Sequence, residues 1–208
     1  MNQTALENPN SARFCFVSLA CVVLSSVLHY SLYSIWIQLN LRKEAAAMFL
    51  CNLCPRRCNA PRTDTEGSGF CGMGLLPLVS RAAPHLWEEP CISGKNGSGT
   101  VFFSGCTLRC VYCQNSEISN NGFGEVITVE RLCNIFLSLQ DRGADNIELV
   151  TPTHFIPDII SALDRVKSKL DIPVVYNCGG YELTETIKRL EGYIDVYLPD
   201  IKYFSPDI

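Results

Sequence analysis

Residues 105–115 read Gly-Cys-Thr-Leu-Arg-Cys-Val-Tyr-Cys-Gln-Asn and directly follow the apolar run 100–104. This stretch places Cys106, Cys110 and Cys113 in one short loop. Cysteine thiolates are the usual ligands of iron–sulfur clusters, and a loop this short can wrap a cluster but cannot easily supply a fourth thiolate. One iron would then keep an open coordination position, which separates a site that binds substrate from one that only holds structure.

Two other interpretations of these three cysteines stay open. They could belong to a zinc knuckle, or to half of a disulfide framework of the kind found in small secreted proteins. Zinc pairs favour Cys-x-x-Cys repeats, whereas the spacing here is three residues and then two. The chain has 12 cysteines, ten of them after residue 50 in ligand-like groups, which indicates a reducing, metal-loading compartment, the cytoplasm. The pattern therefore favours an iron–sulfur cluster.

The spacing Cys106-x-x-x-Cys110-x-x-Cys113, with Tyr112 before the last cysteine, resembles the signature of the radical S-adenosylmethionine (radical SAM) enzymes. The resemblance implies that the three cysteines hold a 4Fe-4S cluster, whose fourth iron binds the amino and carboxylate groups of SAM. By position, Tyr112 becomes a candidate SAM contact near the adenine. In such enzymes the cluster and SAM supply the chemistry, while the protein supplies ligation, orientation and exclusion of water.

Residues 48–95 form a second segment, rich in glycine, proline and cysteine, for which we expect loops. Four of its cysteines have a ligand-like spacing: Cys51-x-x-Cys54-x-x-x-Cys58, followed by Cys71. They predict a closed structural site, for zinc by preference or for a second cluster. The alternative is a set of reduced cysteines without a metal, since the first three do not form two Cys-x-x-Cys pairs. We expect Arg56, Arg57 and Arg62 on a solvated face and Cys91 as a buried free thiol.

The N-terminal residues 1–47 contain a long uncharged run. Residues 14–41 lack Asp, Glu, Lys and Arg, and a run of this length exceeds the roughly 20 residues that span a bilayer. It predicts one hydrophobic helix, and the basic residues Arg42 and Lys43 after it would leave the cysteine-rich part in the cytoplasm. Polar residues dilute the run, and Met48 would make a natural start for a soluble enzyme. Residues 1–47 are therefore either a membrane anchor or an extension from a mis-assigned start, with a cleaved signal peptide the least favoured.

From residue 96 onward the pattern becomes periodic. Short β-prone runs occupy residues 100–104, 147–150, 174–176 and 196–198. Apolar residues at helical offsets lie between them, within residues 132–139, 156–163 and 183–190. Strands that alternate with helices predict an α/β fold with a parallel sheet built from βα units, in a domain that covers residues 96–208.

The chemistry of such a sheet lies in the loops that follow the carboxyl ends of its strands. The first strand leads into the cysteine loop, and the loops after the other three strands carry polar side chains. Among these, Asn177 and Glu182 could bind the ribose hydroxyls of SAM, and Asp200 and Lys202 could orient SAM or serve the substrate. Each of them alone could equally make a turn or an ion pair, but together they crowd one rim and indicate a binding site.

From Cys51 onward the chain is similar to the branch of radical SAM proteins related to pyruvate formate-lyase activating enzyme. The stretches that carry this similarity are Cys51–Arg57, Trp87–Gly94 and Tyr197–Asp200. The resemblance implies a partial, TIM-like (β/α)6 barrel of which about four βα units are present, so the chain looks C-terminally truncated. Many members carry Gly-Gly-Glu after the second strand to hold the SAM amino group. This chain has Thr151-Pro152-Thr153 there, so Thr151 and Thr153 are candidate replacements.

The resemblance implies oxidoreductase or lyase chemistry, in which SAM is cleaved reductively to methionine and a 5′-deoxyadenosyl radical that abstracts hydrogen. It also implies an electron donor such as flavodoxin or ferredoxin, and a protein substrate whose glycine is activated to a glycyl radical. Two alternatives stay open: a radical SAM maturase of peptides or small metabolites, and a non-catalytic cysteine-rich module that binds zinc or an iron–sulfur cluster. The net charge of −4 gives no basic footprint, so we expect no nucleic-acid partner.

Overall fold

The computed structural model describes residues 49–202, which all fall within one unit of the chain, Met48–Ile208. The hydrophobic helix predicted within residues 14–41 lies outside the described residues and stays a prediction. Between residues 49 and 202, none of the helices has the length and apolar character needed to span a bilayer.

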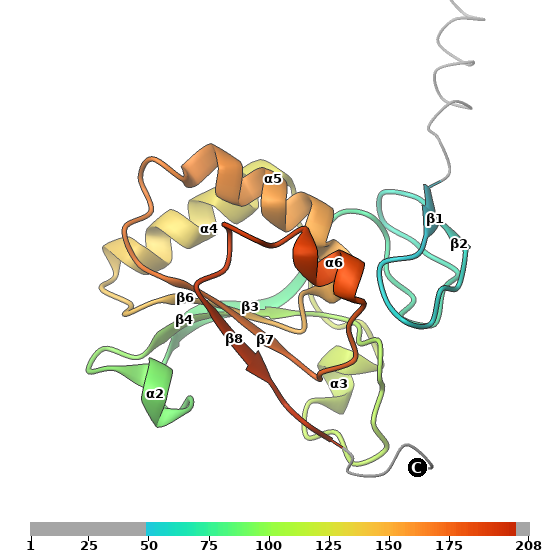
Figure 1. The fold of residues 1–208 in the computed structure, drawn as a ribbon, viewed down its shortest axis with the longest axis horizontal. Coiled ribbons are helices and arrows are strands. Elements are labelled where there is room, and N and C mark those ends of the chain that lie inside the picture. Colours follow the sequence, from blue (N-terminus) through green and yellow to red (C-terminus); the bar gives the residue numbers. More distant parts are fainter. Residues whose placement is uncertain (1–48, 203–208) are drawn as a thin grey trace, which may run out of the picture. The chain divides into compact units, whose positions relative to one another are not determined.

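A six-stranded mixed sheet runs through this unit, in the order β5-β3-β4-β6-β7-β8. Figure 1 labels its strands β3, β4, β6, β7 and β8. Its parallel part consists of β4 (Ser98–Phe103), β6 (Ile147–Val150), β7 (Val174–Cys178) and β8 (Val196–Pro199). These are the four strands that the sequence predicts, so the expected alternation of strand and helix is confirmed. Their parallel pairing brings the four carboxyl ends to the same edge of the sheet.

Two further strands, β3 (Leu78–His85) and β5 (Glu125–Val126), extend the sheet beyond its parallel part. β3 pairs antiparallel with both β4 and β5. It lies in the segment that the sequence predicts to be rich in loops, and the sequence analysis predicts no strand at these residues. The reason is the composition of β3, where alanines, an arginine and a proline replace a run of β-branched residues, and where the register shifts between Val79 and Arg81.

Two amphipathic helices, α4 (Val129–Asp141) and α5 (Ile156–Val166), pack against each other and cover one face of the sheet (Figure 1). α4 begins after Thr128, whose hydroxyl accepts a hydrogen bond from the Arg131 N–H at 3.2 Å. Its apolar residues recur at helical spacing and are buried: Leu132, Phe136 and Leu139. Burial of each such side chain stabilises the fold by about 1.5–3 kcal/mol. The remaining described helices are short: α2 (Pro90–Ser93), α3 (Ser116–Ser119), the 3-10 helix η1 (Thr153–Phe155) and α6 (Thr184–Lys188).

The central strands present an apolar face and a polar face, because successive side chains of a strand point in opposite directions. Val101 of β4 and Ile147 and Leu149 of β6 lie in the main core with the helices. Thr100 and Glu148 alternate with them and are equally buried. The fold therefore encloses polar groups on the face opposite α4 and α5, and these groups belong to the site described below.

A separate two-stranded sheet precedes β3 and consists of β1 (Phe49–Cys51) and β2 (Ala60–Arg62). Arg62 ends β2 and is only 3% exposed. Its guanidinium donates hydrogen bonds to the carbonyl oxygens of Met73 at 3.0 Å and His154 at 2.8 Å. The expectation of a solvated face is therefore wrong for Arg62, which supplies donors to buried carbonyl groups.

Two other expectations about exposure have opposite outcomes. Arg56 and Arg57 are exposed, as the sequence predicts. Cys91 is exposed as well, although the sequence predicts a buried thiol. This cysteine lies in α2, a single turn in which Ile92 and Ser93 take the buried positions, so its thiol is left at the surface.

Candidate functional site

β4 leads directly into the cysteine loop, residues 105–115, which we call the cluster loop. The turn at Gly105 has a φ of 81°, and a Cβ added there would lie 2.4 Å from Cγ of Met73. Both the backbone conformation and the lack of space therefore require glycine at this position. Further along, the Cys113 N–H donates to the Cys110 carbonyl at 3.1 Å, which turns the chain between the second and third cysteines.

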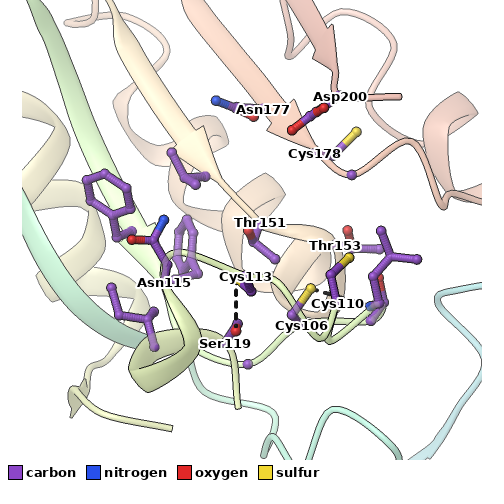
Figure 2. Close-up of a pocket in the computed structure, with 18 of the residues that line it drawn as sticks. Cys106, Cys110, Cys113, Asn115, Ser119, Thr151, Thr153, Asn177, Cys178 and Asp200 are labelled. Atoms are coloured by element: carbon purple, nitrogen blue, oxygen red, sulfur yellow. Dashed lines mark hydrogen bonds between the residues drawn. The ribbon is translucent and has the colours of Figure 1, made fainter. Parts of the chain in front are cut away.

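The three thiols of the cluster loop are half-buried, and those of Cys106 and Cys113 accept hydrogen bonds. The Leu108 N–H donates to Cys106 Sγ at 3.4 Å, and the Ser119 hydroxyl donates to Cys113 Sγ at 3.4 Å (Figure 2). Such bonds orient the sulfur atoms, which are the atoms that would bind a metal. Within residues 49–202, no group of three or more His, Cys, Asp or Glu side chains is arranged to hold a metal ion as it stands. A cluster would therefore draw these thiolates together, and three soft thiolates on one loop are the donor set that it needs.

The cluster loop forms one wall of a cavity of about 450 Å³, and the loops after β6, β7 and β8 form much of the rest (Figure 2). Residues of β4 and α3, together with Glu88, complete its lining. The residues that the sequence places at the strand ends all line this cavity: Cys106, Cys110, Tyr112, Cys113, Thr151, Thr153, Asn177, Glu182, Asp200 and Lys202. The cavity lies where ligands bind in parallel sheets. Its volume falls within the range of about 300–1,000 Å³ that is typical of small-molecule sites.

Thr151 has an unusual backbone conformation directly after β6. Its φ is 55°, in the left-handed region that favours glycine, and its N–H donates to the Asn177 carbonyl at 2.9 Å. A β-branched residue in this region is an outlier, and such strain is concentrated at functional sites. This strained turn places Thr151 in the wall of the cavity.

Thr153, Tyr176 and Glu182 form a buried hydrogen-bonded chain beside the cluster loop. The Tyr176 hydroxyl donates to Thr153 Oγ1 at 3.2 Å, and the Thr153 hydroxyl donates to Glu182 Oε1 at 2.8 Å. Burial raises the pKa of Glu182 to about 7, although the hydrogen bonds from Thr153, Tyr176 and Cys178 oppose the rise. Two predicted residues are therefore brought together, and Tyr176, which the sequence analysis missed, joins them.

Glu148 lies within β6 and is fully buried on the polar face of the sheet. Its carboxylate accepts hydrogen bonds from Thr100 Oγ1 at 3.0 Å and from Asn177 Nδ2 at 2.8 Å, so it fixes the amide of Asn177. Burial, and then the charge and hydrogen bond of Glu148, raise the pKa of Glu88 to about 7. The sequence analysis missed both glutamates. The single charge in the apolar strand Ile147–Val150 is the signal that could have indicated Glu148.

Asp200 and Lys202 follow β8 and form an ion pair. The sequence analysis left this pairing open as an alternative to a functional role, and both residues also line the cavity. The hydrogen bond with Asp200 raises the pKa of Lys202, so the lysine stays cationic. Tyr112 contributes a side chain that is 56% exposed to the same cavity wall.

The four cysteines of the N-terminal segment line a second and much smaller cavity: Cys51, Cys54, Cys58 and Cys71. Burial is the main cause that raises the pKa of Cys54 and of Cys71. Other thiols of the same group raise both values further, while backbone N–H groups of Arg56 and Met73 lower them. These cysteines therefore form one interacting group.

Comparisons with known proteins agree with the pattern of the cluster loop. The model of the radical SAM superfamily matches residues 100–208, slightly more than half of the chain. The uncharacterized protein MJ0674 of Methanocaldococcus jannaschii is 33% identical over 162 residues, which cover 74% of this chain and 45% of that protein. The pyruvate formate-lyase-activating enzyme of Clostridium pasteurianum is 30% identical over 125 residues, which cover 56% of this chain and 50% of that enzyme. The chain thus spans about half the length of these relatives. No solved structure matches it.

Proposed function

Since this chain belongs to the radical SAM superfamily, we propose that it holds a 4Fe-4S cluster at Cys106, Cys110 and Cys113 and binds SAM in the adjoining cavity. The observation that carries the proposal is the position of three thiols of one loop in the wall of a 450 Å³ cavity. When bound, the cluster supplies the electron that breaks the bond between the sulfur and C5′ of SAM, giving methionine and a 5′-deoxyadenosyl radical that abstracts hydrogen from a substrate.

In this proposal the loops after β6, β7 and β8 bind and orient SAM. Thr151 and Thr153 follow the strand next to β4 and would face the amino group, with the carboxyl group of Glu182 held at the same place by Thr153. Asn177, whose amide is fixed by a buried carboxylate, is suited to a ribose hydroxyl. The Asp200–Lys202 pair would orient SAM or meet the substrate, and Tyr112 would lie near the adenine.

We assign the substrate to the class of proteins that receive a glycyl radical, with a flavodoxin or ferredoxin as the electron donor. The support is the similarity to a pyruvate formate-lyase-activating enzyme, which is 30% identical over 56% of this chain. Thiolates that must stay reduced to hold a cluster favour the cytoplasm as the location. A peptide or a small metabolite as substrate is the rival, and radical transfer to a glycyl-radical enzyme in vitro separates the two.

The experiment that tests the cluster and SAM sites is electron paramagnetic resonance. The full chain is reconstituted with iron and sulfide without oxygen, reduced, and measured at low temperature with and without SAM. We expect a 4Fe-4S signal that changes when SAM is added, and 5′-deoxyadenosine as a product. A 4Fe-4S signal that stays unchanged when SAM is added would contradict the SAM site. The absence of any cluster signal would favour a non-catalytic zinc module.

Two cysteine variants make this test specific. Cys110→Ala removes one proposed ligand and should abolish the signal. Cys91→Ser is the matched control, because Cys91 is exposed and lines neither cavity, so this variant should keep the full signal. Equal cluster content in the two variants would refute the ligand assignment.

A further inference from the structure

The four cysteines of the N-terminal segment take no part in the proposed reaction, yet the fold brings them together. Cys51 ends β1, and the loop between β1 and β2 carries Cys54 and Cys58. Two backbone hydrogen bonds shape this loop: the Arg57 N–H donates to the Cys54 carbonyl at 3.0 Å, and the Asn59 N–H donates to the Cys51 carbonyl at 3.1 Å. Three thiols of this group are therefore presented by one structured hairpin.

Cys71 reaches the same cavity from the turn at residues 69–72. The Gly72 N–H closes this turn by donating to the Gly69 carbonyl at 2.9 Å. The turn places Cys71 in the wall of the cavity that Cys51, Cys54 and Cys58 also line. Thiols from two separate turns therefore border one small space, and a bound cation would draw them together.

We propose that Cys51, Cys54, Cys58 and Cys71 bind one zinc ion in a closed, structural site. Four thiolates complete a tetrahedral shell and leave no position open for a substrate, in contrast to the three thiols of the cluster loop. The space between the thiols favours a single ion over a second iron–sulfur cluster. This cavity measures about 20 Å³, little more than the roughly 10–15 Å³ that holds one water molecule. The exposed thiol of Cys58 would move inward to close the shell.

The zinc would stabilise the N-terminal segment around these four cysteines, which contacts the cluster loop. Arg56 Nε donates to the Thr107 carbonyl at 2.5 Å, and Arg109 Nη2 donates to the Cys71 carbonyl at 3.1 Å. The ring of Phe70 contacts both guanidinium groups, with Arg56 Cζ at 3.4 Å and Arg109 Cζ at 5.2 Å from its centroid. A metal at these cysteines therefore acts on the cluster loop through these side-chain contacts and not through shared ligands.

The first test measures metal in the full chain with Cys106, Cys110 and Cys113 all changed to Ala. This variant cannot form the proposed catalytic cluster, so its result does not depend on the proposed function. We expect about one zinc and almost no iron per chain. When cobalt replaces the zinc, we expect the intense thiolate-to-cobalt absorption of a tetrahedral site. Iron in several-fold excess over the chain, or zinc well below one per chain, would overturn the proposal.

The second test compares two single variants in that background. Cys58→Ser removes an exposed ligand without disturbing the core, and Cys91→Ser removes an exposed cysteine outside the site. We expect the first to lower the affinity for zinc by at least tenfold in a competition with a chelator, and the second to leave it unchanged. Equal affinities would refute the site, and circular dichroism of both variants verifies that they are folded.

Discussion

Burial raises the pKa of two carboxyl groups at the cavity, those of Glu88 and Glu182. Glu182 is packed against Thr153 and Tyr176, and Glu88 lies against the buried Glu148, so in both places the low polarity of the surroundings opposes the charged form. The pKa of each of Glu88 and Glu182 is raised to about 7. Carboxyl groups that titrate near neutral pH beside a binding cavity make its charge, and the stability of its walls, sensitive to pH.

Glu182→Gln tests this link between burial and pH. Because the pKa of Glu182 in the folded protein is raised from 4.5 to about 7, its protonated form stabilises the fold fully below about pH 4.5. That contribution is lost as the pH rises through about 7, by an amount on the order of 2–3 kcal/mol. The variant keeps an acceptor for Thr153 but has no titrating group, so it should lose less stability than the wild type between pH 5 and pH 7.5, roughly the window of the shift.

Urea unfolding at the two pH values measures the difference. Glu185→Gln is the control, because Glu185 is an exposed side chain on the same stretch, and it should keep the pH dependence of the wild type. Identical pH dependence in the wild type and Glu182→Gln would show that burial does not control this carboxyl group.

Gly105→Ala tests the turn that starts the cluster loop. Alanine would adopt a φ of 81° and would place its Cβ 2.4 Å from Cγ of Met73, so it costs both backbone strain and a steric clash. We expect a loss of at least about 2 kcal/mol in the free energy of unfolding and a clear loss of cluster iron. Gly143→Ala is matched in conformation, with a φ of 83°, but has open space around it. It should cost only about 1 kcal/mol and keep the iron. Similar iron contents in Gly105→Ala and Gly143→Ala would contradict the conclusion that the turn at Gly105 requires glycine.

Elements far apart in the chain meet at Arg62, the last residue of β2. Its planar guanidinium donates to carbonyl groups of Met73 and Gly74, which follow Cys71, and of His154 in η1. His154 in turn contacts the Ser104 carbonyl at 2.7 Å, one residue before Gly105. The hairpin, η1 and the start of the cluster loop are therefore joined by one buried arginine.

Arg62→Lys should damage this junction although it keeps the charge. The ammonium group of lysine carries its donors on a single nitrogen. It therefore cannot reach the separate carbonyl groups that the nitrogens of the planar guanidinium group contact. We expect a loss of about 2–4 kcal/mol in the free energy of unfolding. Arg57→Lys is the control, because Arg57 forms an exposed pair with Glu185 at 2.7 Å. It should change stability by less than about 1 kcal/mol. Urea unfolding measures the free energy of unfolding of both variants. A loss as small for Arg62→Lys as for Arg57→Lys would show that a single donor group is enough to stabilise this junction.

The cluster loop could be predicted from the sequence because its three cysteines and the strand before it are neighbours in the chain. The parallel strands were also predictable, since each is a short β-prone run between helical patterns. β3 was not, because its pairing with β4 and not its composition makes it a strand. The buried hydrogen bond from Arg62 to His154 joins residues that are 92 positions apart in the chain. The bond from Asn177 to Glu148 joins residues that are 29 positions apart. No local sequence pattern predicts such contacts.

At the scale of the whole molecule, we expect the group of cysteines in the cluster loop to depend on the N-terminal group, and not the reverse. The proposed zinc segment touches the cluster loop through Arg56, Arg109 and Phe70, whereas the three thiols of the cluster loop do not line the small cavity. Loss of zinc should therefore loosen the cluster loop, while loss of the cluster should leave the zinc site intact. Groups that orient metal ligands typically contribute about 10–100-fold to metal affinity.

This asymmetry gives a prediction for two variants of the full chain. Cys58→Ser should lower the zinc content. It should also weaken the retention of the 4Fe-4S cluster against a chelator, by roughly tenfold in affinity, although Cys58 is not among the proposed ligands of that cluster. Cys110→Ala should abolish the cluster and keep about one zinc per chain. Iron and zinc are measured by elemental analysis, and the cluster by its visible absorption. If Cys58→Ser kept a full cluster after losing its zinc, the zinc would not support the loop, because the contacts of Arg56 and Arg109 would then hold the loop in place without the metal.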